Sequence, residues 1–209
     1  MKYVSGAWLP DDEQDKVMLG AGASYQAPKF MSALSWTGNR RLAVDIGAHC
    51  GLWSMQFVKA FFENIVAFEP LDRHVECYRK NVQEGAYVLH QVALGNRHGT
   101  CGIKLVEGLS GRSHVDGDGD VPMMKLDDFG LSPDLIKIDV EGYELFVLKG
   151  AEETLLRCKP VMIVEQKPQH TNGRYGLPDT AAVDYLMSLG AKQRDHIAGD
   201  WVLSWDRPQ

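Results

Sequence analysis

The stretch RLAVDIGAHCG, residues 41–51, decides the fold that this sequence predicts. Its apolar run from Leu42 to Ile46, interrupted by Asp45, is typical of a parallel strand that is buried on both faces. Gly47 and Gly51 indicate a tight turn, and the apolar segment 52–63 after it predicts a largely buried helix. A strand, a glycine turn and a helix in this order open an α/β domain of the nucleotide-binding type.

The spacing of the turn indicates which ligand it suits. A dinucleotide fingerprint that starts at Gly47 needs glycines at 49 and 52, where this chain has His49 and Leu52. The pattern is instead D-x-G-x-x-x-G, which suits a ligand that carries its own ammonium and carboxylate groups, such as the methionine part of S-adenosylmethionine. The N-terminus of the following helix presents free N–H groups to such a ligand. The alternative is a tight strand–helix turn that binds nothing.

A second acidic residue supports the ligand-binding interpretation. The segment IVAFEP, residues 65–70, is another apolar strand and ends in Glu69, 24 residues after Asp45. A carboxylate at this strand end is placed to accept both ribose hydroxyls of an adenosine, and Pro70 ends the strand. The alternative is that Glu69 caps the helix predicted to begin near Leu71. We expect the ribose role because the glycine turn is present as well.

The composition narrows the class of protein. A chain of 209 residues is most simply one domain with a full core. The net charge of −6 argues against a duplex-DNA binder with a wide phosphate footprint. The four cysteines form no CxxC pair and are expected to be reduced thiols in a cytoplasmic protein. Neither a secretory signal nor a run of apolar residues long enough for a membrane span is visible.

The order of predicted elements gives the architecture. Residues 1–40 are expected to form an N-terminal extension with a helix over 28–36, which either acts as a lid on the cofactor pocket or packs on one face. Residues 41–209 are expected to form the main domain, in which 168–178 is a polar loop and the glycine-bounded pieces between 99 and 130 extend the sheet as hairpin-like strands. Further strands are expected at 86–94, 135–140, 160–167, 191–197 and 200–206. Helices are expected at 71–85, 143–149 and 181–190, with a second helical turn after Gly150 through Leu156. This pattern predicts a doubly wound, mostly parallel α/β sheet of seven strands with an antiparallel C-terminal hairpin.

Five pieces of the chain also resemble one family. They are VDIGAHCG at 44–51, AFEP at 67–70, VALGN at 92–96, LDDF at 126–129 and IKIDVEGYELFVLKGAEETL at 136–155. In order and spacing, over about residues 42–166, they resemble the FkbM family of S-adenosylmethionine-dependent methyltransferases. The resemblance implies a Rossmann-like class I methyltransferase fold, S-adenosylmethionine as cofactor, and methylation of a hydroxyl on a sugar or natural product.

The sequence departs from the family pattern at two places. Cys50 stands within the glycine turn, and GRSHV at 111–115 replaces a segment that more often carries paired serines. The ends of the chain, which usually decide the substrate, match nothing that identifies it. With the resemblance, the expected cofactor site comprises Asp45, Gly47, Ala48, His49, Gly51, Glu69, Pro70, Ala93 and Asp139.

The expected catalytic residues are Asp139, Glu141 and Glu165, which lie at or just after the carboxyl ends of predicted strands. Asp139 suits a general base for an alcohol acceptor. The three carboxylates could instead bind a divalent cation, for which their hard oxygens suit magnesium, and His114 and His170 lie in segments that could reach the same place. We favour a metal-free site, because only Asp139 and Glu141 form a close acidic pair. Glu141 could also be simply a carboxylate near a helix N-terminus.

The leading hypothesis is therefore an S-adenosylmethionine-dependent O-methyltransferase acting on a sugar or another small molecule. The first alternative is a methyltransferase that acts on nucleic acid or a nucleotide, which the acidic net charge disfavours. The second alternative is a nucleotide-binding module that keeps the fold without the chemistry, against which the intact Asp139 and Glu141 argue. A dehydrogenase is opposed by His49, whose Cβ obstructs a pyrophosphate.

Overall fold

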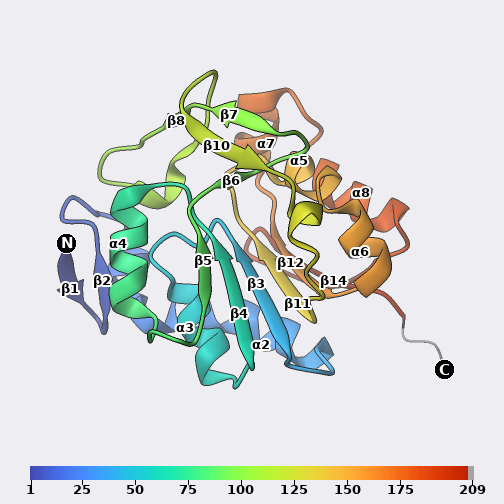
Figure 1. Ribbon diagram of the computed structural model, residues 1–209, viewed down its shortest axis with the longest axis horizontal. Coiled ribbons are helices and arrows are strands. Elements are labelled where there is room, and N and C mark those ends of the chain that lie inside the picture. The colour runs from blue at the N-terminus through green and yellow to red at the C-terminus, as the bar shows by residue number, and fades with distance from the viewer. Residues whose placement is uncertain (207–209) are drawn as a thin grey trace.

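The computed structural model describes residues 1–206, apart from the side chain of Asn172. Within these residues the main sheet has seven strands in the order β13-β14-β12-β11-β3-β4-β5 (Figure 1). The strands are β3 (Leu42–Ile46), β4 (Asn64–Phe68), β5 (Val88–His90), β11 (Leu135–Ile138), β12 (Val161–Glu165), β13 (Lys192–Ile197) and β14 (Asp200–Ser204). Five neighbouring strands pair in parallel, namely β12, β11, β3, β4 and β5. β14 pairs antiparallel with both of its neighbours, β12 and β13. The predicted doubly wound sheet with an antiparallel C-terminal hairpin is confirmed.

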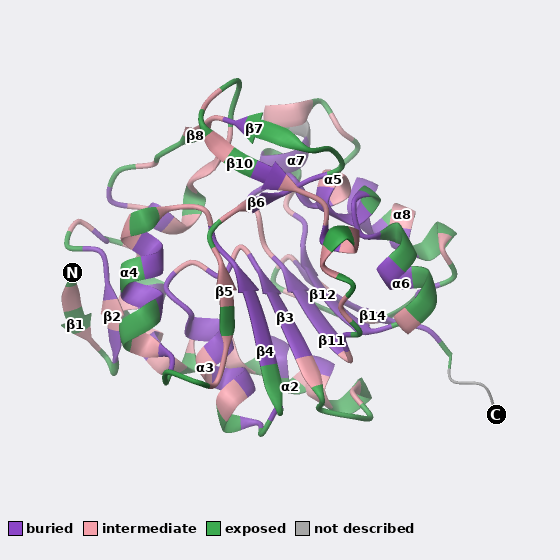
Figure 2. Cartoon of the chain, viewed as in Figure 1, coloured by how far each residue is buried: buried purple, intermediate pink, exposed green. Residues whose placement is uncertain are grey.

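Helices cover both faces of this sheet. One face packs against α2 (Ala27–Trp36), α3 (Leu52–Lys59) and α4 (Asp72–Asn81), and the other against α5 (Glu144–Lys149), α6 (Glu152–Cys158) and α8 (Ala181–Ser188). Neighbouring strand residues point to opposite faces, so that Ala43 packs with Phe57 while Val44 packs in the cluster of Val147. Figure 2 shows the central strands almost entirely buried. Burial on both faces explains why these strands are continuous apolar runs in the sequence.

The first 40 residues share a core with the rest of the chain. They form β1 (Lys2–Val4), β2 (Ala7–Leu9), α1 (Lys16–Ala21), the short 3₁₀ helix η1 (Gly22–Ser24) and α2. Phe30 and Ala33 of α2 are buried in one cluster with Trp53 and Phe57 of α3, and Lys29 forms a buried ion pair with Asp200 of β14. The predicted helix over 28–36 is confirmed, and α2 packs on the sheet. A lid role for other parts of this segment stays a prediction.

The region between β5 and β11 differs from the prediction. The expected strand at 86–94 divides into β5 and β6 (Ala93–Leu94), and the glycine-bounded pieces do not extend the main sheet. They form two small sheets, in which β10 (Val121–Met124) lies between β6 and β7 (Gly99–Cys101), and β8 (Ile103–Lys104) pairs with β9 (His114–Val115). Figure 1 shows this layer above the carboxyl ends of the main strands. The layer forms because Leu94, Cys101 and Met123 bury their side chains in the cluster of Phe68.

A second prediction is also wrong. The segment 168–178 was expected to be a polar loop, but most of it forms the helix α7 (Pro168–Tyr175). Pro168 occupies the first helical position, which proline favours, and the Lys167 carbonyl accepts hydrogen bonds from the N–H groups of His170 and Thr171. Tyr175 then donates a hydrogen bond to the Val115 carbonyl at 2.7 Å. These tertiary contacts outweigh a composition that is poor in helix-forming residues.

Two further 3₁₀ helices, η2 (Ser110–Arg112) and η3 (Leu126–Phe129), complete the described elements. Among residues 1–206, none of the helices combines the length and the apolar character that a bilayer span requires.

Candidate functional site

Two cavities open at the carboxyl ends of the parallel strands, where ligands bind in open α/β sheets. The first lies between the main sheet and the small sheets and spans about 620 Å³, a volume that includes space open to solvent. The second lies between the main sheet, α1 and α7 and spans about 1050 Å³ on the same basis. The described residues that line both cavities are Gly47, His49, Gly111, Asp139 and Glu141. The cavities therefore meet at the turns that follow β3 and β11.

Glu69 is a buried carboxylate in the wall of the first cavity. Its Oε1 atom accepts the Leu71 N–H at 3.0 Å and lies 3.0 Å from His74 Nδ1, and its Oε2 atom accepts the His49 N–H at 2.8 Å. Burial alone raises the pKa of Glu69, but the His74 imidazole and the two N–H groups outweigh it and hold that pKa below its ordinary value. The geometry thus leaves Oε2 with capacity for one more hydrogen bond.

His49 has a positive φ of 50°, a conformation that histidine tolerates better than most residues. In this conformation its N–H points at Glu69, and its ring Nε2 lies 2.7 Å from Ser110 Oγ of the opposite segment. Ser110 is held in turn by the Glu13 carboxylate. His49 therefore ties the glycine turn to the segment of Ser110 and Gly111, which lines the cavities.

The expected cofactor residues are not all exposed to a cavity. Within the described residues the first cavity includes Glu69, Pro70 and Ala93, the second includes Ala48, and neither includes Asp45 or Gly51. Asp45 is fully buried and accepts a hydrogen bond from Ser54 Oγ at 2.7 Å. Gly51 has φ +80° at the start of α3, where an added Cβ would lie 2.8 Å from the Tyr78 ring. Asp45 and Gly51 therefore stabilise the turn through contacts inside the protein and not through the cavities.

Lys137 lies next to Asp45 in the pairing of β11 with β3 and is buried at the centre of this turn region. Its Nζ donates to the Gly47 carbonyl at 3.0 Å and lies 3.6 Å from Asp45 Oδ1 and 3.8 Å from Asp139 Oδ2. Burial lowers the pKa of Lys137, but the Asp139 and Asp45 carboxylates outweigh it and raise that pKa above its ordinary value. A charged lysine thus joins the ends of two strands.

Asp139 lies in the wall that the two cavities share, and its side chain is 18% exposed. Burial and the Glu165 carboxylate raise the pKa of Asp139 well above its ordinary value, with a further contribution from Glu141 and an opposing one from Lys137. Asp139 lines both cavities. Among the three expected catalytic residues, it is also the one whose side chain makes no direct hydrogen bond to a neighbouring side chain within the described residues. It is free to bind a ligand.

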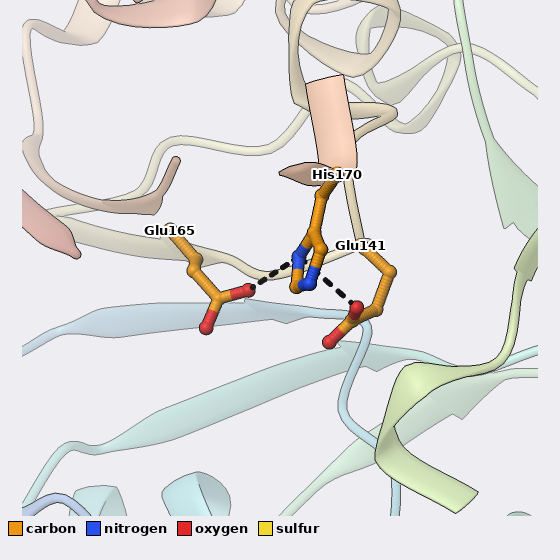
Figure 3. A group of neighbouring side chains, drawn as sticks. All are labelled: Glu141, Glu165 and His170. Carbon is orange, nitrogen blue, oxygen red and sulfur yellow. Dashed lines mark ion pairs between the residues drawn. The ribbon is translucent and has the colours of Figure 1, made fainter. Parts of the chain in front are cut away.

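Glu141 and Glu165 converge in the wall of the second cavity, together with His170 (Figure 3). His170 Nδ1 lies 3.1 Å from Glu141 Oε2 and 3.6 Å from Glu165 Oε2. Lys167 pairs with Glu165 Oε1, and Arg174 pairs with the Glu141 carbonyl and with Glu141 Oε2. The sequence brought Glu141 and Glu165 into consideration. The sequence also names His170 as able to reach this place, and the structure brings its ring there on α7 and not on a loop.

Other residues at this site are visible mainly in the structure. His74 contacts Glu69 from the first turn of α4, and Ser110 contacts His49 across 61 positions of sequence. His114 lines the first cavity, as do Asp139 and Glu141, whereas Glu165 lines only the second. Lys137 was detectable in principle, because it is a lone charge within an apolar strand.

Glu144 has a structural role. Its Oε1 atom accepts the N–H groups of Val140 and Gly142 at 3.1 and 3.0 Å, which closes the turn that carries Glu141. Its Oε2 atom is buried and makes no hydrogen bond within the described residues. Burial raises the pKa of Glu144 to about 7. The folded protein therefore favours a protonated Glu144.

This shift predicts a pH-dependent stability. The unfolded chain ionises Glu144 near its ordinary pKa of 4.5, whereas the folded chain does so near 7, so that the contribution of this residue to folding falls as pH rises between these values and is constant above them. Relative to wild type, Glu144→Gln should gain about 3 kcal/mol between pH 4.5 and 7.5. Urea denaturation at several pH values measures this difference. A difference that does not vary with pH would contradict the assignment.

Comparison with known proteins identifies the family. The model of the methyltransferase FkbM domain matches residues 45–196. No curated protein matches the chain by sequence. Among solved structures, a methyltransferase FkbM from Methylobacillus flagellatus has a TM-score of 0.55 at 19% sequence identity. The match covers 79% of this chain but only 43% of the Methylobacillus chain, so this chain spans less than half the length of that protein.

Two further structures share the fold. The N-methyltransferase NodS from Bradyrhizobium japonicum, in complex with S-adenosyl-L-homocysteine, has a TM-score of 0.55 at 10% identity over 93% of this chain and 91% of its own. An rRNA methylase from Streptococcus thermophilus has a TM-score of 0.51 at 11% identity over 88% and 95%. The predicted resemblance is confirmed, and with a family model that spans the site described above, the chain belongs to the FkbM methyltransferase family.

Proposed function

We propose that this chain transfers a methyl group from S-adenosylmethionine to a hydroxyl of a sugar or another small molecule. The observation that carries this proposal is that two cavities meet at Asp139. A methyl donor in one cavity and an acceptor in the other would face each other across this residue. Membership of the FkbM family supports the reaction class, and the S-adenosyl-L-homocysteine bound by the NodS protein supports the cofactor.

The residues of the first cavity fit an adenosine. Phe68, Leu94 and Val92 give it apolar walls that suit an adenine ring. The open hydrogen-bonding capacity of Glu69 Oε2 suits a ribose hydroxyl. Because Oε1 is already occupied by Leu71 and His74, we assign one ribose hydroxyl to this carboxylate.

S-Adenosylmethionine, when bound, supplies an electrophilic sulfonium methyl group whose leaving thioether needs no proton. The acceptor oxygen forms its bond to the methyl carbon as the carbon–sulfur bond breaks, so that alignment of the two molecules provides most of the acceleration. In our proposal Asp139 accepts the hydroxyl proton, a role worth about 10²–10⁴-fold in rate. Lys137 positions Asp139 and the Gly47 carbonyl relative to each other.

The second cavity is the proposed acceptor site. Its walls carry carboxylates of Asp139, Glu141 and Glu165 as well as the cations Arg112 and Lys167. Such a polar, enclosed wall suits a small molecule with several hydroxyl groups. The net charge of −6 offers little attraction to a phosphate backbone. We therefore place a sugar-like acceptor before nucleic acid.

The ribose contact gives a quantitative prediction. Glu69→Ala should weaken binding of S-adenosylhomocysteine by about 1.5–3 kcal/mol, the range for a hydrogen bond to a charged group. Glu69→Gln keeps an acceptor oxygen and should lose less. Isothermal titration calorimetry measures both affinities, and circular dichroism confirms that the variants are folded. If both variants bind like wild type, Glu69 serves only to hold Leu71, His49 and His74.

Transfer of tritium from methyl-labelled S-adenosylmethionine to pools of sugars and polyols tests the function itself. We expect label in a hydroxylated product of low molecular mass. Label recovered in RNA from a parallel incubation, and absent from the sugar and polyol pools, would contradict the proposed acceptor class. Binding of S-adenosylhomocysteine without transfer to any pool would favour the inactive nucleotide-binding module.

A further inference from the structure

Three metal-ligating side chains from three different segments converge in the wall of the second cavity. Glu141 lies in the turn between β11 and α5, Glu165 is the last residue of β12, and His170 lies in α7. One ligand atom of each lies within 4.8 Å of the others. Figure 3 shows the imidazole between the two carboxylates, with all three side chains directed toward one another. All three are buried.

Hydrogen bonding does not satisfy this cluster. Glu165 Oε2 and His170 Nδ1 are buried, yet neither has a hydrogen-bond partner within the described residues. The Glu165 side chain is only 3% exposed, so water compensates it little. A single Nδ1 proton cannot serve two carboxylates at once, and 3.6 Å between Nδ1 and Glu165 Oε2 is too long for a hydrogen bond. Buried polar atoms without protein partners are typical of a place where an ion or water binds.

The surrounding charges hold the carboxylates in place and leave Glu165 Oε2 without a hydrogen bond within the described residues. Lys167 pairs with Glu165 Oε1, which directs Oε2 toward His170. Arg174 donates to the Glu141 carbonyl and reaches Glu141 Oε2 at 3.3 Å. Its bond to the carbonyl anchors Arg174 independently of the carboxylate. The Glu141 carboxylate can therefore turn toward a cation without loss of that anchor.

We infer that Glu141, Glu165 and His170 bind one divalent transition-metal ion, with Mn²⁺ or Zn²⁺ as the chemical type. An imidazole nitrogen suits zinc and similar ions, and carboxylates suit manganese, so that this mixed donor set selects against a purely oxygen-liganded magnesium ion. The inference reverses the metal-free expectation from the sequence, which placed His170 in a loop. The helix α7 brings its imidazole to the two carboxylates.

The ion would have a place in the reaction. Three protein ligands leave coordination positions open, as in catalytic metal sites, and all three residues line the second cavity beside Asp139. On the proposed function, on which this step rests, the acceptor hydroxyl binds at an open position. The ion then lowers the pKa of that hydroxyl, and Asp139 accepts its proton. The ion thus selects an acceptor whose hydroxyl can bind a metal directly.

Titration of the chelator-treated full chain with Mn²⁺, followed by electron paramagnetic resonance, tests this site. We expect one Mn²⁺ per chain, competition by Zn²⁺, and a thermal melting temperature that rises with Mn²⁺. His170→Gln and Glu165→Gln should each weaken Mn²⁺ binding by at least about tenfold. Mutation even of residues that only support the metal ligands lowers metal affinity by about 10–100-fold. Circular dichroism confirms that each variant is folded.

His98→Gln is the matched control. His98 also contacts a carboxylate, that of Asp128, but at an exposed position outside the cluster, so that this variant should bind Mn²⁺ like wild type. Absence of saturable Mn²⁺ and Zn²⁺ binding to wild type would overturn the inference, as would equal affinity in all variants. S-Adenosylhomocysteine binding in the same samples separates the two proposals. If wild type binds S-adenosylhomocysteine but no metal, only the metal site is overturned. If wild type does not bind S-adenosylhomocysteine, the proposed function is overturned.

Discussion

Replacement of Asp139 by Asn should lower kcat by about 10²–10⁴-fold, because the amide cannot accept the proton of the acceptor hydroxyl. The substitution keeps the shape of the side chain in the wall between the two cavities. The affinity for S-adenosylhomocysteine should change little, since the proposed cofactor contacts lie at Glu69 and the glycine turn. Formation of S-adenosylhomocysteine from S-adenosylmethionine, with a sugar and polyol pool as acceptor, measures kcat.

Asp195→Asn provides the matched control for this substitution. Asp195 is an aspartate of β13 that hydrogen-bonds to Ser32 and lines neither cavity among the described residues. The kcat of the Asp195→Asn variant should equal that of wild type. An Asp139→Asn protein with full turnover would contradict a general-base role and leave Asp139 as a partner of Lys137 only. A large loss of cofactor affinity in Asp139→Asn would instead indicate that this carboxylate binds the cofactor itself.

The second large effect is expected at Gly47. Its φ is +71°, and an added Cβ would lie 1.9 Å from the Asp139 carbonyl oxygen. Gly47→Ala therefore combines a left-handed backbone, which costs an L-residue about 1–2 kcal/mol, with overpacking, which costs about 1–3 kcal/mol. The variant should lose about 2–5 kcal/mol of unfolding free energy. Chemical denaturation measures the loss, and a variant that does not fold at all agrees with it.

Gly85→Ala isolates the backbone contribution. Gly85 has a similar φ of +86°, but an added Cβ would meet nothing within 4 Å. This variant should lose only the backbone part, about 1–2 kcal/mol. Equal stability of the two variants would show that the turn does not pack on the end of β11 as described. The sequence alone predicts that a side chain at 47 obstructs the cofactor and leaves the fold largely intact. The second part of this prediction is wrong, because the added Cβ would overlap the Asp139 carbonyl oxygen.

Local patterns in the sequence were sufficient to predict the main sheet. Apolar runs such as 42–46 and 135–138 are buried on both faces, and this burial is what the pattern records. Glycine at 47 and 51 marks positive φ in the same way. Glu69 followed from its place at a strand end. These predictions depend on neighbours within a few residues, and for this reason a single sequence contains them.

The remaining features depend on contacts between distant residues. The small sheets form because Leu94 and Met123 pack on Phe68, and α7 forms because Tyr175 and its neighbours contact segments that are far away in sequence. His170 meets Glu141 only when α7 is in place. No periodicity in 168–178 signals that helix, so the sequence could name Glu141, Glu165 and His170 as neighbours but not show that their side chains converge.

A crystal structure of the chain with S-adenosylhomocysteine tests the central proposal most directly, because it locates the donor relative to Asp139. We predict the adenosine in the first cavity, a ribose hydroxyl within hydrogen-bonding distance of Glu69 Oε2, and the homocysteine sulfur at the wall formed by Gly47, His49 and Asp139, facing the second cavity. A ligand with its ribose away from Glu69, or with its sulfur directed away from the second cavity, would contradict the proposed transfer between the two cavities.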